Sequence, residues 1–180
     1  RLVAAWYGNF EWFSQIIQLF EFDDIDSLKD FRKKSSQDKE WGEYAAQLEV
    51  FAPERRTRLL EPLGAVKPEV LHKAIEESQK SPLNVYSIAM LEVAPNQMTN
   101  FTTAVEMGSK VLPIIASWRP IAGSPNLVID LWKGDVLWSA NEWAYKPALE
   151  AQKEMMRNLR IQAPKERIVP IYALPYSPLK

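Results

Sequence analysis

The chain has 180 residues, of which 47% are hydrophobic and 25% charged, and its formal net charge is −1. This composition is typical of a globular protein with a substantial core, and the near-neutral charge argues against a nucleic-acid partner. Cysteine is absent and His72 is the only histidine, which excludes disulfides, thiolate nucleophiles and cysteine–histidine zinc sites. We therefore expect no metal and no cofactor, and no motif marks a catalytic residue. No apolar run is long enough to span a membrane, although peripheral membrane association stays open.

Two similar β-hairpins are the strongest local signals. Residues 2–22 and 114–135 each contain two runs of β-branched and aromatic residues separated by turn-forming residues. After the first hairpin, helical spacing predicts a short helix from about residue 25 that breaks at Ser35-Ser36, and a second helix over 37–51. A short strand is predicted over 57–61.

The rest of the chain alternates between predicted strands and helices. Residues 62–83 form a proline-containing linker with a small amphipathic helix over 69–79. The predicted elements that follow are a strand over 84–93, a helix over 97–111, the second hairpin, a helix over 136–159 and a strand over 167–174. Because Pro170 cannot donate a ladder hydrogen bond, we expect this last strand at a sheet edge.

The two hairpins belong to an internal repeat. Trp118 follows Trp6 by 112 positions (118 − 6 = 112), and the same offset relates further identical residues. These pairs are Ala4/Ala116, Ile17/Ile129, Leu19/Leu131, Lys34/Lys146 and Glu54-Arg55/Glu166-Arg167. The order β-α-β-β-α-β in the second half predicts a ferredoxin-like unit with both helices on one face of an antiparallel sheet.

The repeat predicts an α+β fold with two tandem ferredoxin-like units that pair as an intrachain pseudo-dimer. Residues 1–61 are the first unit, 62–83 the linker and 84–180 the second unit. The offset places the counterparts of the second unit's first strand and helix ahead of Arg1, so we expect the first unit to lack both. Either about 30 ordered residues precede Arg1 in the natural protein or another subunit supplies them. We expect strand 2–7 to lie beside an open or partner-filled position.

Strand alternation assigns the hairpin residues to two faces. The identical pairs share one face, which we expect to pack under the helices. The opposite face of the second hairpin carries Ser117, Arg119, Asp130 and Trp132, which would look into a cavity between the two sheets. These four residues are candidate ligand-binding residues. A satisfied Arg119–Asp130 pair across the hairpin is the alternative, and the hairpin register that decides it is not fixed by the sequence.

Two further features have a functional and a structural interpretation. Arg55, Arg56 and Arg58 form a basic cluster that could dock an acidic partner, or serve as a solvated strand edge or a helix C-cap. His72, in the predicted linker helix, is expected at the surface, with haem ligation as the alternative.

The chain resembles the NIPSNAP family. The resemblance rests on LVAAW…IIQLFEFDD, on Asp38-Lys39-Glu40-Trp41, on the strand that begins Val85-Tyr86 and on the terminal Ser177-Pro178-Leu179-Lys180. It implies two tandem dimeric α+β-barrel domains and a mitochondrial location. It also implies a non-enzymatic role through protein–protein interaction, as a scaffold or an accessory subunit of a larger mitochondrial assembly. The alternative is a small-molecule- or haem-binding protein, or a cofactor-independent monooxygenase-like enzyme, that uses the cavity between the sheets.

Overall fold

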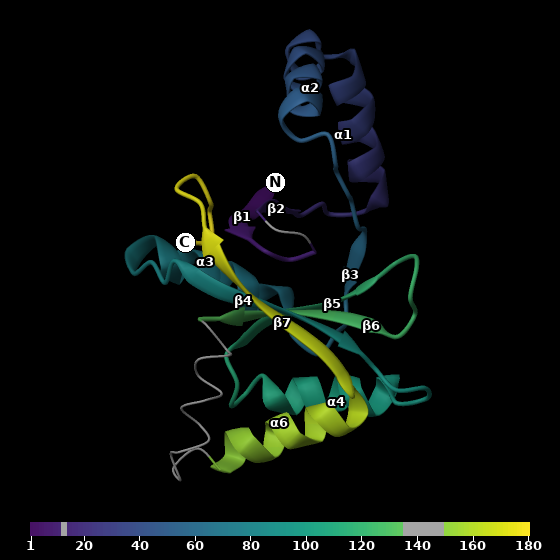
Figure 1. The fold of residues 1–180 in the computed structure, drawn as a ribbon, viewed down its shortest axis with the longest axis vertical. Coiled ribbons are helices and arrows are strands. Elements are labelled where there is room, and N and C mark those ends of the chain that lie inside the picture. Colours follow the sequence, from purple (N-terminus) through teal and green to yellow (C-terminus); the bar gives the residue numbers. More distant parts are fainter. Residues whose placement is uncertain (12–13, 135–149) are drawn as a thin grey trace. The chain divides into compact units, whose positions relative to one another are not determined.

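The structure is a computed structural model that describes residues 1–11, 14–134 and 150–180. The chain divides into two compact units: the smaller contains Arg1 and Phe20–Arg58, and the larger contains Leu2–Leu19 and Leu59–Lys180. In Figure 1 the larger unit is the sheet with its covering helices, and the smaller unit is a pair of helices. Among the described residues the fold is α+β, with seven antiparallel strands and five helices.

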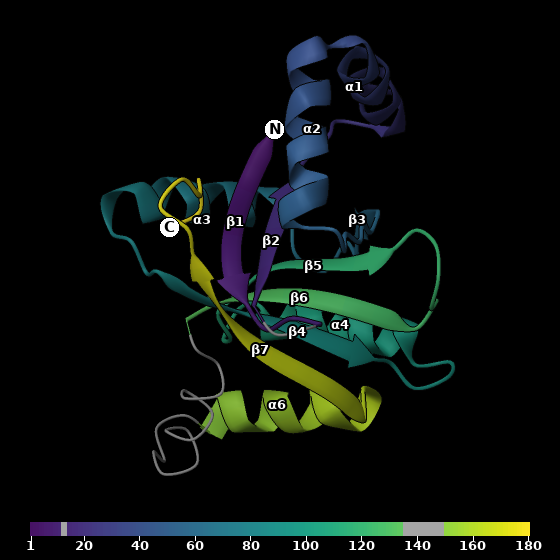
Figure 2. The same cartoon turned by 45° about the horizontal axis from the view of Figure 1, so that its top comes forward.

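One curled sheet dominates the larger unit (Figure 2). Its strands follow the spatial order β2-β1-β7-β4-β6-β5-β3. Their bounds are β1 Leu2–Gly8, β2 Gln15–Phe20, β3 Leu60–Pro62, β4 Val85–Glu92, β5 Ile114–Pro120, β6 Leu127–Lys133 and β7 Lys165–Ala173. The helices of this unit are α3 Pro68–Lys80, α4 Met98–Gly108 and α6 Glu150–Gln162. The predicted helix over 136–159 is observed from residue 150; its earlier part lies outside the described residues.

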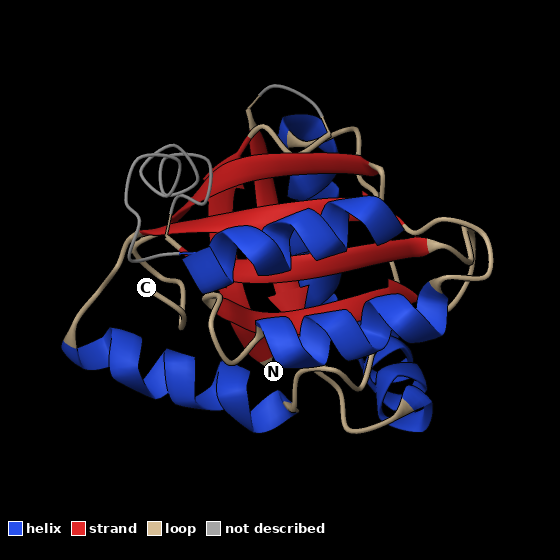
Figure 3. Cartoon of the chain, turned by 90° about the horizontal axis from the view of Figure 1, so that it is seen from below, coloured by secondary structure: helices blue, strands red, loops and turns tan. Residues whose placement is uncertain are grey.

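Helices α4 and α6 lie side by side across one face of the sheet (Figure 3). We call this the helix face. Phe101 and Val105 of α4 and Met156 and Leu159 of α6 pack there against Trp132 of β6. Every third or fourth residue of these helices is apolar, so each helix buries one stripe.

The opposite face of the sheet has a second core, which we call the inner face. It joins β1, β4, β5, β6 and β7 to Leu71 and Ala74 of α3 and to Leu179 of the C-terminal tail. All eight residues of the four identical hairpin pairs belong to this core: Ala4, Trp6, Ala116, Ile129 and Leu131 are buried, and Ile17, Leu19 and Trp118 are partly buried. The predicted shared packing task is confirmed. The predicted place under the helices is wrong for α4 and α6, which cover the opposite face.

The repeat also appears in the observed elements. β1 shifted by 112 positions coincides with β5, β2 falls within β6, and α2 (Lys39–Phe51) matches α6 to within one residue. One hydrogen bond recurs as well: Glu21 N–H donates to Arg1 O at 2.9 Å, and Lys133 N–H donates to Pro113 O at 2.9 Å.

β1 lies between β2 and β7, so a strand of the second half fills the position beside it. The prediction of an open position beside strand 2–7 is therefore wrong; in the part of the chain that the structure describes, the strands at the two ends of the sheet are β2 and β3.

The predicted edge position of the last strand is wrong, because β7 lies between β1 and β4. Ala173 N–H donates to Asn84 O next to β4, whereas Leu174 N–H donates to Ala5 O of β1. By alternation, the nitrogen of Pro170 points to the β1 side, yet β1 ends where Gly8 pairs with Ile171. Pro170 therefore lies just past the end of its neighbour and removes no ladder bond.

The smaller unit consists of α1 Ile25–Gln37 and α2 Lys39–Phe51. Asp24 caps α1 by accepting a hydrogen bond from Ser27 N–H at 2.7 Å, and Asp38 caps α2 by accepting one from Trp41 N–H at 3.1 Å. The predicted break at Ser35-Ser36 was too early, because α1 continues to Gln37 and the chain turns at Asp38. Neither helix contains a buried residue.

Candidate functional site

A fully buried acid is the most unusual polar feature of the larger unit. Asp130 of β6 is paired in register with Ser117 of β5, and the Ser117 hydroxyl donates to Asp130 Oδ1 at 2.5 Å. Both side chains lie on the helix face, and both are buried. Asp130 Oδ2 has no hydrogen-bond partner among the described residues. A buried oxygen without a partner is costly, so this position requires a physical explanation.

Burial sets the charge of this acid. It raises the pKa of Asp130 to about 7, although the hydrogen bond from Ser117 acts in the opposite direction and the nearby Glu166 adds to the rise. Burial also raises the pKa of Glu166, against the effect of Arg160, whose Nε lies 3.5 Å from Glu166 Oε2. Near neutral pH the neutral and charged forms of Asp130 therefore coexist.

The other two members of the predicted ligand-binding set lie elsewhere. Arg119 is half exposed and bonds Glu61 of β3 at 2.6 Å, so the predicted Arg119–Asp130 pair is not formed. Trp132 is buried among α4 and α6. Because Asp130 and Trp132 share the helix face, they do not look into a cavity between two sheets. The structure thus brings together Ser117 and Asp130 alone of the four.

The predicted partner-binding cluster is exposed at all three positions, Arg55, Arg56 and Arg58. Arg55 Nη2 lies 3.3 Å from Glu49 Oε1, so Arg55 forms an ion pair with an acid of α2. His72 is half-buried on α3, beside the buried Leu71.

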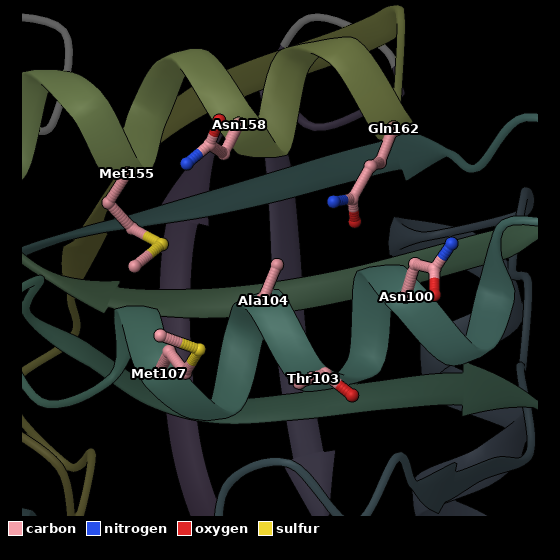
Figure 4. Close-up of a pocket in the computed structure, with 7 residues that line it drawn as sticks. All are labelled: Asn100, Thr103, Ala104, Met107, Met155, Asn158 and Gln162. Atoms are coloured by element: carbon pink, nitrogen blue, oxygen red, sulfur yellow. The ribbon is translucent and has the colours of Figure 1, made fainter.

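A shallow groove runs between α4 and α6. Its volume is about 320 Å³, and Figure 4 shows amide and methionine side chains of the two helices facing each other across it. The lining residues are Asn100, Thr103, Ala104, Met107, Met155, Asn158 and Gln162. Gln162 Oε1 is buried without a partner in the described part of the chain. The groove can accept hydrogen bonds and apolar contacts, but it contains no charged group.

A row of aromatic rings joins the two helices of the smaller unit. Phe22, Phe31, Trp41 and Tyr44 form consecutive ring contacts with centroid distances of 5.7, 5.8 and 5.6 Å. Phe31, Trp41 and Tyr44 are each more than two-fifths exposed, and we call these three residues the aromatic row. The sequence predicted the helix over 37–51 that carries Trp41 and Tyr44, but it did not predict that these two side chains lie at the surface. The sequence contains seven tryptophans, a high number that was the available signal of an aromatic-rich surface.

The described residues contain neither a cluster suited to a metal ion nor a helix suited to a membrane span. No group of three or more histidine, aspartate or glutamate side chains in ranges 1–11, 14–134 and 150–180 could hold a metal ion. No described helix is long and apolar enough to cross a bilayer.

Comparison with known proteins assigns no relative. No family model matches the sequence, and neither a curated protein nor a solved structure matches at a significant level. The fold places the chain in the class of α+β proteins with a curled antiparallel sheet. Membership of the NIPSNAP family stays a prediction from the sequence.

Proposed function

We propose that this protein acts through protein–protein interaction, with the aromatic row of α1 and α2 as its docking surface. The observation that carries the proposal is that these two helices bury no residue while they present Phe31, Trp41 and Tyr44 to solvent. A pair of amphipathic helices normally gains its stability by burying its apolar face. An aromatic patch left at the surface is typical of a binding surface.

The expected partner presents an apolar groove or helix with a polar rim. Trp41 makes ring contacts on both sides, with Phe31 and with Tyr44, and so holds the centre of the patch. Aromatic anchors of this kind supply most of the free energy of binding at interfaces. The role is that of a scaffold or accessory subunit, without catalysis.

We propose further that the fold is a tandem ferredoxin-like pseudo-dimer of the NIPSNAP type. The spatial order β7-β4-β6-β5, with α4 and α6 on one face, agrees with a ferredoxin-like unit over residues 84–180. β1 pairs with β7 and β5 pairs with β3, which are equivalent pairs under the repeat. A mitochondrial location and partners within a mitochondrial complex follow from the family resemblance.

Ligand binding by the larger unit is the second candidate. It is favoured by one observation, the unpartnered Oδ2 of the buried Asp130. Small-molecule, haem or monooxygenase-like chemistry would require a cavity that reaches this atom, and the groove between α4 and α6 is a candidate because these helices cover the same face.

Site-specific photo-crosslinking tests the interaction proposal. A photoreactive phenylalanine derivative replaces Tyr44 in the aromatic row, or Tyr176 as a matched exposed tyrosine of the larger unit. We expect a discrete crosslinked protein from position 44, lost in Trp41→Ser, and none from position 176. Far-UV circular dichroism checks that Trp41→Ser keeps its helices. The same products from both positions, or no product at 44, would contradict the proposal.

A further inference from the structure

The groove between α4 and α6 is lined by a second stripe of residues on each helix. Positions 100 and 104 of α4 each precede a residue of the helix-face core, Phe101 or Val105. Positions 155 and 158 of α6 precede Met156 and Leu159 in the same way. One residue turns an α-helix by about 100°, so the groove stripes point sideways from the stripes that contact the sheet. Figure 4 shows the two sideways stripes facing each other.

One end of the groove carries carboxamide side chains. Asn100 and Gln162 lie at this end (Figure 4), and Asn158 stands about one turn before Gln162 on α6. The side chains of Asn158 and Gln162 form no hydrogen bond with the described part of the chain. Turning either amide group therefore breaks no bond and lets its donor or its acceptor face the groove. Because a carboxamide presents a donor and an acceptor side by side, these residues suit a ligand that carries peptide groups.

The other end of the groove is apolar. Met107 of α4 and Met155 of α6 approach it from opposite sides (Figure 4). Gly108 leaves room for Met155, since a Cβ at position 108 would lie 3.2 Å from Met155 Cγ. Methionine side chains are flexible and polarisable, and they recur on surfaces that bind apolar groups of varied shape. This end of the groove therefore suits an aliphatic side chain.

The charge and depth of the groove restrict the kind of ligand further. None of its described lining residues is charged, so a charged ligand would find no counter-charge there. Its volume of about 320 Å³ corresponds to about ten water-sized groups. Sites for free small molecules enclose most of the ligand surface, which a shallow groove does not do. A chain-like ligand that continues beyond both ends of the groove is therefore favoured over a free small molecule.

We propose that this groove binds an extended peptide segment that is uncharged over the length of the groove. Its aliphatic side chain lies between Met107 and Met155, and its main-chain amides form hydrogen bonds with Gln162 and Asn158. The proposal rests on the hydrogen-bonding pattern, charge and shape of the groove, independently of the aromatic row. Asp130 is not among the lining residues, so the proposal does not depend on the buried acid either.

Nuclear magnetic resonance of the full chain with isotope-labelled methionine methyl groups tests the proposal. The probe is a blocked, uncharged pentapeptide, acetyl-Ser-Ala-Leu-Ala-Ser-methylamide. We expect saturable shifts of the Met107 and Met155 signals at millimolar probe concentration, because a groove of this size contacts few ligand atoms. The signal of Met90, which packs on the inner face, is the internal control and should not move.

Matched probes separate the parts of the ligand. A pentapeptide with ester groups in place of the two amides that flank leucine keeps its shape but loses two N–H donors, and it should bind about fivefold more weakly. A pentapeptide with aspartate in place of leucine should not bind, because the apolar end of the groove cannot solvate a charge. Acetyl-leucine-methylamide, which carries the central residue alone, should bind more weakly than the pentapeptide.

Substitution of Gln162 distinguishes a binding residue from a structural one. Gln162→Leu should weaken binding of the pentapeptide by about fivefold without lowering the melting temperature, because it removes a buried oxygen that has no partner among the described residues. Gln47→Leu, which alters an exposed carboxamide of α2, is the matched control and should leave the affinity unchanged.

Several outcomes would overturn the proposal. Shifts that do not saturate, or that are equal at Met90, would show that the pentapeptide does not bind in the groove. Equal affinity of the ester probe, or of Gln162→Leu, would exclude recognition of peptide groups by the carboxamides. Equal affinity of acetyl-leucine-methylamide would indicate a small-molecule site instead of a peptide site. None of these results bears on the crosslinks expected from position 44.

Discussion

The two hairpins are alike in sequence and strand bounds but differ in what covers them. On the inner face, identical residues such as Ala4 and Ala116 meet in one core. On the helix face, Trp132 is buried beneath α4 and α6, while its counterpart Phe20 is half exposed. Local sequence therefore fixes strand formation and the direction of each side chain. Burial is decided by the neighbour that arrives from elsewhere in the chain or from a partner.

The largest expected effect comes from truncating the two matched aromatics. Trp132→Ala should lower the free energy of unfolding by about 3–5 kcal/mol, because it empties a closed part of the core. Phe20→Ala should cost less than about 1 kcal/mol, since about half of that side chain is already exposed to solvent. Urea denaturation of both variants measures the difference. Equal losses of unfolding free energy in the two variants would show that Phe20 is buried in solution, contrary to its exposure in this structure.

The second prediction concerns the buried acid, whose counterpart in the first hairpin is the exposed Gln18. The pKa of Asp130 rises from 3.8 to about 7 on folding, so the folded state holds a proton that the unfolded state releases between these values. The resulting stability is fully present below about pH 4 and is lost as the pH rises through 7. The loss amounts to at most about 4 kcal/mol.

Asp130→Asn should therefore remove most of this pH dependence and make the protein more stable than the wild type at pH 8. Glu166, whose pKa is also raised by burial, leaves a smaller dependence of the same sign. Gln18→Asp is the matched control, because it places a carboxylate at the equivalent exposed position and should not change the slope. Thermal denaturation from pH 5 to pH 8 gives the comparison. A wild type whose stability is flat over this range would show that Asp130 is solvated.

The smallest effect is expected at Arg119, whose counterpart is Tyr7. Its ion pair with Glu61 joins β5 to β3, but the two side chains are 50% and 44% exposed. Arg119→Ala should lower the free energy of unfolding by less than about 1 kcal/mol, and the loss should shrink at high salt. A double-mutant cycle with Glu61→Ala isolates the pair. A coupling energy well above 1 kcal/mol would show that water is excluded from this edge of the sheet.

The sequence predicted most elements because their signals are local. Asp24 and Asp38 cap the helices that follow them, and turn residues separate the strands of each hairpin. The faces were assigned the wrong way round because alternation defines two sides without saying which one receives α4 and α6. The register of the second hairpin could not be predicted from the sequence either, since the pairing of β5 with β6 shifts between Ile114 and Ala116. Pro170 led to a wrong prediction of an edge strand, because only this one residue of the central strand β7 lacks a neighbour on the β1 side.

The candidate site was predicted in part. Ser117 and Asp130 were selected together and do meet, because cross-strand pairing brings them opposite each other. Arg119 was expected to neutralise Asp130, but its partner is Glu61, which lies 58 residues away in the chain. Such long-range pairing depends on the order of strands in the sheet. The aromatic row was missed because an apolar helix stripe has the same spacing whether it faces a core or a partner.

The C-terminal tail has a consequence for how the protein is made. Ser177 Oγ accepts a hydrogen bond from Ala5 N–H, 172 residues away, and Leu179 N–H donates to Val3 O. During synthesis the apolar stretch around Val3 and Trp6 leaves the ribosome long before β7 and this tail exist to receive it. Contacts of such sequence separation form late and slow the folding reaction. We therefore expect the nascent hairpin to expose this apolar stretch until residues 174–179 have been made and pack against it, and such transiently exposed surface is what chaperones protect.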